Sequence, residues 1–316
     1  MARLTRLLKI INNEELRIKN WLPQIFCAVL ISIFTFHFSF SYAQDSSYVR
    51  RIVCDLASPA MYGRGMQHRG DSIAADYLRS ELRMLGVKPL CNDYYQYFLF
   101  PQTRTKPPVV NAGYRSQNVC GYLPGETDTM IVFTAHYEHL GMNGDTIFYG
   151  AHDNASGTAA VMDLARMLSA QSLKYTCVFL FFGGEESGLV GSHHFAGHPL
   201  IDYGKVKLLV NIDLFCGGDD GLMVVNANAP ETNPYVERLE RINDRHHYAA
   251  KIARRDNARN SDHYYFTAHC PAIFIYTLGG PFGGYHSPTD TCNGCGLANY
   301  HRHMSLLRTF LEQLDK

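Results

Sequence analysis

The sequence predicts an α/β fold with a largely parallel, mixed central sheet that helices cover on both faces. Two observations support this fold class. Continuous apolar runs without polar alternation indicate strands that are buried on both faces, as in a parallel sheet. Segments with helical periodicity separate these runs, and this alternation is typical of α/β domains. The 316 residues are enough for one large domain with a sizeable core.

The first elements of the domain are expected to be helices. Residues 48–56 read as one helix, and residues 72–85 read as a second, with Asp71 as its candidate N-cap. Residues 88–125 are richer in proline, turn residues and aromatics, so they predict short strands and loops. We expect residues 44–125 to supply the N-terminal helices and edge segments of the same domain.

Four apolar runs in the remaining chain are expected to be strands of the central sheet: residues 131–133, 178–182, 208–210 and 272–276. Apolar residues recur at helical spacing over residues 161–168 and again over residues 306–314. Polar residues that could bind a metal ion or take part in catalysis follow each strand or lie in the loop beyond it. An open α/β sheet places its active site there, outside the carboxyl ends of its strands.

The amino terminus is predicted to be a secretory signal over residues 1–43. Basic residues in the first 20 positions precede an apolar stretch over residues 25–34, and Ser41-Tyr42-Ala43 supplies small residues for cleavage after Ala43. The mature catalytic domain is then residues 44–316. The apolar stretch is short for a membrane span of about 20 residues. We therefore expect a secreted or periplasmic protein without stable membrane insertion, with an anchor formed by the uncleaved signal as the alternative.

Charge and cysteine content bear on partners and compartment. The 29 Lys+Arg balance the 29 Asp+Glu, so the chain lacks the basic footprint of a nucleic-acid-binding protein. Nine cysteines are present, and the eight that remain without Cys27 permit disulfides in an exported protein. For Cys292 and Cys295 we expect a local disulfide or two free thiols, not a metal site. The sequence does not indicate an oligomeric state.

Two imidazoles and three carboxylates at the predicted strand ends form a candidate ligand set for two metal ions. They are His136, Asp153, Glu186, Asp213 and His286. A mixed nitrogen and oxygen set suits two Zn²⁺ ions that share one bridging carboxylate. Glu185, directly before Glu186, is then left to act on water as a general base. Five other histidines are expected not to be ligands: His139, His152, His193, His194 and His263.

The segments that contain these residues resemble metallopeptidase family 28, the co-catalytic zinc aminopeptidases. This family also contains glutamate carboxypeptidase and the glutaminyl cyclases. The resemblance covers nearly the whole mature chain, from residues 58–65 through residues 117–119 to residues 289–291. The segments around Asp153, Glu185-Glu186 and Tyr285-His286 are specific when they occur together.

The resemblance implies a division of the five ligands between two zinc ions. His136 and Asp213 are expected to hold one ion, Glu186 and His286 the other, and Asp153 is expected to bridge them. Two such ions lower the pKa of a shared water and stabilise the tetrahedral intermediate of peptide hydrolysis.

The resemblance also implies roles for three further acids. Glu185 is expected to take a proton from the water that bridges the metals and to pass it to the leaving amine. Glu138 lies two residues after His136, where the family keeps an Asp that orients the first histidine. Asp262 resembles an acid that contacts the general base in relatives.

The sequence departs from the family pattern at two further positions. His152 stands directly before the bridging Asp153, where an Asp is common. The tyrosine that stabilises the oxyanion in some members has no counterpart, since Ala258 occupies its position. Arg259, Tyr264 and Tyr276 are the candidates to replace it; the alternative is that the metals alone stabilise the oxyanion.

The predicted function is that of a zinc-dependent exopeptidase acting on peptides, specifically an aminopeptidase; a dipeptidase or carboxypeptidase is a variant within the family. A glutaminyl cyclase-like acyltransferase with one zinc is the alternative from another reaction class. The segment Asn154-Ala155-Ser156-Gly157 is of the peptidase type and disfavours the cyclase. A non-catalytic binding protein on the same scaffold is disfavoured because Glu185 and all five ligands are present.

Overall fold

A computed structural model describes residues 46–100, 113–280 and 284–314 of the chain. The chain divides into two units after Ala43, and everything described belongs to the second unit. The predicted signal segment and its cleavage site lie outside the described residues. No helix within the described ranges is long and apolar enough to cross a membrane.

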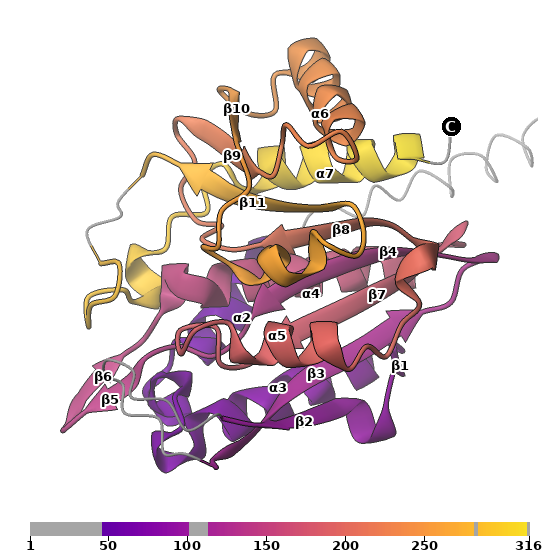
Figure 1. Cartoon of the computed structure of the whole chain (residues 1–316). Helices are drawn as coiled ribbons and strands as arrows, with labels where there is room; N and C mark the ends of the chain where they lie inside the picture. The colour runs from indigo at the N-terminus through magenta and orange to yellow at the C-terminus, as the bar shows by residue number, and fades with distance from the viewer. Residues whose placement is uncertain (1–45, 101–112, 281–283, 315–316) are drawn as a thin grey trace, which may run out of the picture. The chain divides into compact units, whose positions relative to one another are not determined.

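One nine-stranded mixed sheet forms the centre of the domain (Figure 1). Its strands are β1 (Lys88–Pro89), β2 (Tyr95–Leu99), β3 (Arg115–Leu123), β4 (Thr127–His136), β7 (Tyr175–Phe182), β8 (Val206–Ile212), β9 (Gly221–Val225), β10 (Ile252–Arg255) and β11 (Ala272–Leu278). They follow the order β1-β3-β7-β4-β8-β11-β9-β10, and β2 also pairs with β3. The strands β5 (Gly141–Asn143) and β6 (Thr146–Phe148) form a separate hairpin.

The middle of the sheet is parallel, as predicted. Strands β7, β4, β8 and β11 pair in parallel, and β9 pairs in parallel with β10. The pairs β1–β3, β2–β3, β3–β7 and β9–β11 are antiparallel. The predicted fold class, a largely parallel mixed sheet in an α/β domain, is therefore confirmed.

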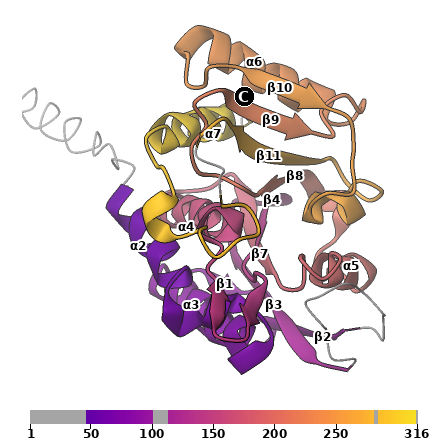
Figure 2. The ribbon, with the colours of Figure 1, turned by 90° about the vertical axis from the view of Figure 1, so that its left-hand side faces the viewer.

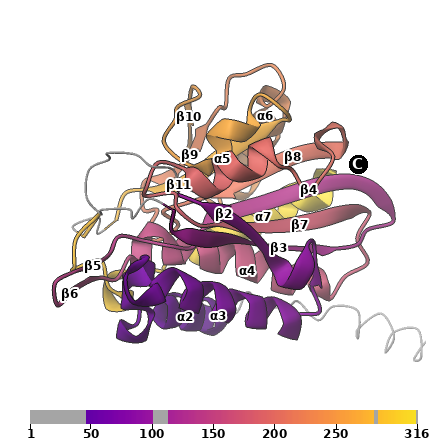
Figure 3. The same ribbon diagram turned by 60° about the horizontal axis from the view of Figure 1, so that its bottom comes forward.

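Helices cover both faces of this sheet. They are α2 (Ser46–Leu56), α3 (Gly70–Met84), α4 (Ser156–Ser169), α5 (Val190–Gly197), α6 (Asn233–His246) and α7 (Tyr300–Leu314). Figures 2 and 3 show α2, α3 and α4 on one face and α5 on the other. Alternate residues of one strand enter different cores: Phe133 packs in the larger cluster and Val132 in the smaller. This is why the strand sequences are apolar without alternation.

Four elements differ from the sequence-based expectations. Strand β3 is nine residues long and lies inside the sheet, although its segment predicted only short strands. Its buried polar residues interrupt the apolar pattern by which a buried strand is predicted. Gln117 hydrogen-bonds with Tyr137, and Asn118 donates to the Gly191 carbonyl. Helix α6 and strands β9 and β10 were not predicted, because their apolar runs are short or sparse.

The expectation that Asp71 caps the second helix is wrong. Helix α3 begins at Gly70, and Arg69 occupies the N-cap position without a side-chain hydrogen bond. Asp71 lies inside the first turn, where its carboxylate accepts from the hydroxyls of Ser116 and Tyr114, at 2.7 and 2.8 Å. A long-range partner on β3, which sequence does not reveal, fixes this side chain.

The expectation of a local Cys292–Cys295 disulfide or two free thiols is also wrong. Cys292 is bonded to Cys54 in α2, and Cys295 is bonded to Cys216 after β8. The Cα atoms lie 5.0 and 5.6 Å apart in the two pairs, within the usual range for disulfides. The two bonds attach the segment after His286 to α2 and to the segment after β8.

The Cys54–Cys292 bond closes a sequence separation of 238 residues. Loss of such a long loop closure typically costs about 2–4 kcal/mol, so Cys292→Ser should lower the unfolding free energy of the oxidised protein by that amount. Cys91→Ser, at a half-buried free cysteine, is the matched control and should change stability little. Recovery of a Cys292–Cys295 peptide by non-reducing peptide mapping would contradict the assignment.

Candidate metal centre

All five predicted ligands lie at one edge of the sheet. His136 is the last residue of β4, Asp213 follows β8, and Glu186 lies in the loop after β7. Asp153 lies in the turn Ala151–Ala155 before α4, and His286 lies in the loop beyond β11. Because β7, β4, β8 and β11 are parallel, their carboxyl ends meet at this edge.

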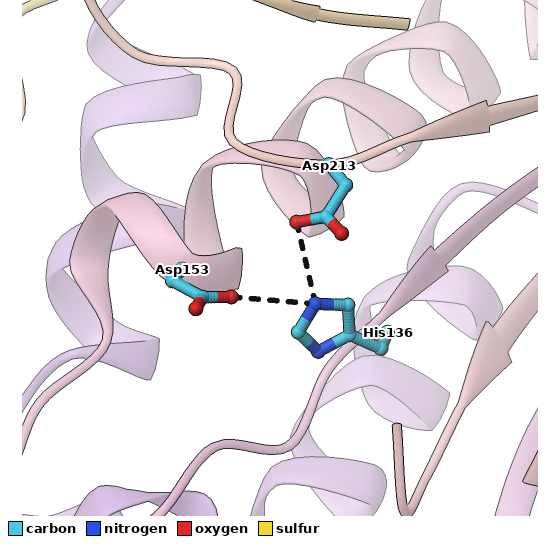
Figure 4. A group of neighbouring side chains, drawn as sticks. All are labelled: His136, Asp153 and Asp213. Atoms are coloured by element: carbon cyan, nitrogen blue, oxygen red, sulfur yellow. Dashed lines mark hydrogen bonds and ion pairs between the residues drawn. The ribbon is translucent and has the colours of Figure 1, made fainter. Parts of the chain in front are cut away.

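The ligand atoms form two groups that share Asp153. His136 Nε2 lies 3.4 Å from Asp153 Oδ1 and 3.3 Å from Asp213 Oδ1 (Figure 4). His286 Nε2 lies 3.0 Å from Asp153 Oδ2 and 3.1 Å from Glu186 Oε2. Asp153 thus directs one carboxylate oxygen to each group, as a bridging ligand requires.

The distances within both groups fit a zinc ion. Zinc bonds of about 2.0–2.2 Å in tetrahedral geometry place neighbouring ligand atoms about 3.3 Å apart. The four separations above range from 3.0 to 3.4 Å. The imidazole and carboxylate donors are also those that zinc accepts. The residues present therefore fit zinc.

A buried arginine holds the segments that carry these ligands. Arg64 is fully buried, and its guanidinium donates only to backbone carbonyls. Its partners, at 2.6–3.4 Å, are the carbonyls of Leu56, Tyr137, Tyr149, Gly150 and Asp153. Burial lowers the pKa of Arg64 to about 10, with Asp290 opposing the shift, so the charge persists at neutral pH. One side chain thus joins the residue after His136 to the loop of Asp153.

Asp290 holds the same loop through its N–H groups. Its Oδ1 accepts from the His152 N–H at 2.8 Å, and its Oδ2 accepts from the Asp153 N–H at 3.0 Å. Asp290 lies four residues after His286 in sequence, so it ties the loop of one predicted ligand to that of another. The backbone of Asp153 therefore lies between a carboxylate and a guanidinium.

Glu185 lies beside the ligands without belonging to either group. It lines a cavity of about 240 Å³ together with His136, Asp153 and Asp213. Burial raises the pKa of Glu185 well above its usual value; His136 opposes this shift, and the acids Glu186, Asp262 and Asp213 add to it. Asp262 is itself fully buried, and burial raises its pKa to about 7.

The structure changes the expected role of Glu138. The acceptor nearest to His136 Nδ1 is the Glu138 backbone carbonyl at 3.2 Å, whereas carboxylate Oε2 lies at 3.5 Å. The other oxygen, Oε1, accepts from the Glu186 N–H at 2.9 Å. Glu138 therefore contacts ligands of both groups, and not only His136.

Two residues at the site were missed by sequence reasoning. His139, expected to lie apart from the metals, forms a candidate ligand group with Asp153 and Glu186. Tyr285 lines the cavity, and its ring stacks on His286 with 3.9 Å between ring centroids. Tyr285 could have been identified from the sequence because it directly precedes the predicted ligand His286. Nothing in the sequence distinguished His139 from the other histidines.

The structure also separates the candidates for oxyanion stabilisation. Tyr276 lines the cavity, whereas Arg259 donates to the Tyr265 hydroxyl. Tyr264 is not among the residues that line the cavity. His152, His193, His194 and His263 belong to neither candidate ligand group of the described residues, and His193 and His194 lie in the predicted helix α5.

Fold and site together define an α/β domain with a histidine- and carboxylate-rich candidate metal centre at the carboxyl ends of its parallel strands. Residues 118–311 match the family model of Peptidase family M28. The chain belongs to this family.

Individual relatives match shorter segments. A probable zinc metalloprotease of Pyrenophora teres f. teres (strain 0-1) is 32% identical over 154 residues, which cover 46% of this chain and 31% of that protein. Aminopeptidase YwaD of Bacillus subtilis (strain 168) is 34% identical over 86 residues, which cover 26% and 18%. The matches thus span less than a third of either relative.

Solved structures show the same fold. The Legionella pneumophila LapA aminopeptidase aligns with a TM-score of 0.63 and 20% identity, over 85% of this chain and 71% of that one. A Porphyromonas gingivalis glutaminyl cyclase aligns with a TM-score of 0.69 and 15% identity, over 85% and 98%. An aminopeptidase and a glutaminyl cyclase thus share this fold with the chain, so the fold does not distinguish between them.

Asp290→Asn should destabilise the protein even without metal. An amide offers one acceptor oxygen, so one of the buried N–H groups of His152 and Asp153 would lose its partner, at a cost of about 1–3 kcal/mol. Chemical denaturation of the metal-free protein measures this change. Asp256→Asn, at an exposed acid that hydrogen-bonds Asn228, is the control. Equal stabilities of the two variants would show that Asp290 does not support the loop.

Proposed function

We propose that the protein is a zinc-dependent exopeptidase, and specifically an aminopeptidase that removes the N-terminal residue of peptides. One observation carries this proposal. Asp153 shares its two oxygens between two complete ligand groups, and Glu185 lines the same cavity without joining either. Two metal positions beside a carboxylate that belongs to neither group suit metal-assisted hydrolysis.

The five predicted ligands would hold two zinc ions. His136 and Asp213 would bind one ion, Glu186 and His286 the other, and Asp153 both. When bound, the ions would lower the pKa of water and polarise the carbonyl of the scissile bond.

Two other side chains would handle the proton and the developing charge. Glu185 would take the proton of the attacking water and pass it to the nitrogen of the leaving amine as the C–N bond breaks. Tyr285 would donate a hydrogen bond from its hydroxyl to the carbonyl oxygen as negative charge develops there. Burial and the nearby carboxylates of Asp153 and Glu186 raise the pKa of Tyr285, which keeps this hydroxyl protonated.

The cavity supports a preference for a neutral, apolar N-terminal residue. Beyond the predicted ligands and Glu185, it is lined by Leu214, Asn260, Phe274, Tyr276 and Tyr285. None of these five side chains carries a charge at neutral pH. A charged substrate side chain would lose its hydration there without gaining an ionic partner.

A glutaminyl cyclase is the second candidate, since cyclases share the fold. The presence of all three residues of the first ligand group, His136, Asp153 and Asp213, favours the peptidase. A one-zinc acyltransferase needs only one metal position, whereas His136, Asp153 and Asp213 bring their ligand atoms together within 4.8 Å beside the second group.

Peptides are the proposed partners, and the balanced charge of the chain gives no reason to expect nucleic acid. We also propose export to the cell exterior or periplasm. The two disulfides, Cys54–Cys292 and Cys216–Cys295, support this location because such bonds persist in oxidising compartments.

Glu185→Gln should keep about two zinc ions per chain and the thermal stability of wild type, but lose hydrolysis by about two to four orders of magnitude, the usual contribution of a general base. Metal analysis and release of a chromogenic amine from amino-acid amides measure the two effects. Glu126→Gln, at an exposed glutamate, should leave both unchanged. Loss of zinc from Glu185→Gln would show that Glu185 is a ligand and not the base.

A panel of amino-acid amides tests the substrate assignment. Leucine and phenylalanine amides should have kcat/KM values at least about tenfold above those of lysine and glutamate amides, because the cavity offers charged side chains no partner. N-acetylated versions should be inert to an aminopeptidase. Conversion of N-terminal glutamine to a cyclic product, without peptide cleavage, would instead establish the cyclase.

A further inference from the structure

We infer that His139 is a positioning residue for the second metal position: its Nδ1–H donates to Glu186 Oε1 and so keeps Oε2 directed at the ion shared with His286. This inference rests on the proposed function, because it takes Glu186 as a ligand. It assigns a role to a histidine that the sequence analysis set aside.

The two oxygens of Glu186 face different imidazoles. Oε1 lies 2.7 Å from His139 Nδ1, and Oε2 lies 3.1 Å from His286 Nε2. His139 is 3% exposed, so water does not compete for this contact. Oε1 of Glu186 therefore faces the proposed hydrogen-bond donor, and Oε2 faces the second metal position.

The separations decide between a ligand and a hydrogen-bond donor. Atoms that share one tetrahedral zinc lie about 3.3 Å apart, and the four such pairs at this site lie at 3.0–3.4 Å. The distance between His139 and Glu186 is shorter, at 2.7 Å. This length falls within the 2.7–2.9 Å of a charge-assisted hydrogen bond. The ring as placed does not complete that bond, and His139 Nδ1 and Glu186 Oε1 are both buried atoms without a hydrogen-bond partner among the described residues. The distance thus favours His139 as a donor beside the ligand over His139 on the ion.

The surroundings fix the imidazole ring. A Cβ on Gly150, whose φ is +57°, would lie 2.5 Å from His139 Cγ and Cδ2, so only glycine leaves room for the ring. The ring meets His286 edge-on, with 5.8 Å between centroids. The His139 N–H donates to the Arg64 carbonyl at 3.5 Å.

Consecutive residues therefore hold the two ends of Glu186. Glu138 Oε1 accepts from the Glu186 N–H at 2.9 Å, while His139 Nδ1 lies 2.7 Å from the Glu186 carboxylate. Both follow His136, a predicted ligand of the first ion. The segment after β4 thus links the two metal positions, and loss of such a partner typically weakens metal binding about 10–100-fold.

Zinc titration of the full oxidised chain against a competing chelator tests the inference. His139→Leu should bind the second zinc about 10–100-fold more weakly than wild type, with the first unchanged. His139→Asn places an amide N–H near the former Nδ1 and should recover most of the affinity. His303→Leu, at an equally buried histidine of α7, controls for loss of a buried imidazole and should leave both affinities unchanged.

Nitrogen NMR of the zinc-loaded wild type, with labelled histidine, gives a readout that needs no folded variant. We expect His139 to carry its proton on Nδ1. A zinc-shifted, unprotonated Nδ1 would make His139 a ligand and overturn the inference, as would wild-type zinc affinity in folded His139→Leu. Wild-type protein that binds only one zinc would instead overturn the proposed two-metal function itself.

Discussion

The burial of one guanidinium constrains the rest of the site. Arg64 has no solvent to hydrate it, so every donor must find an oxygen inside the protein. The carbonyls of Tyr137, Gly150 and Asp153 supply those oxygens. The loop before α4 therefore adopts the path that directs its carbonyls to Arg64 and its N–H groups to Asp290. With its backbone held on both sides, Asp153 can direct its two oxygens to different histidines.

This constraint connects the centre to the covalent framework. Asp290 lies two residues before Cys292, which is bonded to α2, and five before Cys295, which is bonded to the segment after β8. The loop of His286 is thus fixed by two disulfides on one side and by contacts with the Asp153 loop on the other. His286 lies in the loop beyond β11 and is held in place by these bonds. His136 is held directly, because it is the last residue of β4.

Three of the eleven residues other than glycine that have a positive φ in the described ranges lie at this site. Arg64, Leu214 and His286 all have φ angles of 50–55°, in the left-handed region that residues with a Cβ avoid. Leu214 directly follows Asp213, and His286 is itself a predicted ligand. Such conformations cost about 1–3 kcal/mol each and persist where the surroundings determine them. Here the hydrogen bonds of Arg64 and Asp290, together with the disulfides, supply those surroundings.

The sequence by itself determined the four parallel strands in the middle of the sheet, helices that flank them, and the ligand candidates at their ends. Apolar runs and the polar residues at their ends can be recognised within a short stretch of sequence. A strand that is buried on both faces is apolar over consecutive residues. Only the tertiary structure decided how Cys292 and Cys295 pair, that Asp71 bonds to β3 and does not cap a helix, and that His139 faces Glu186. These contacts join residues between 45 and 238 positions apart, and their partners are chosen by where the folded backbone places them. Polar side chains such as Asn118 made β3 hard to recognise from sequence for the same reason, since their partners lie on other elements.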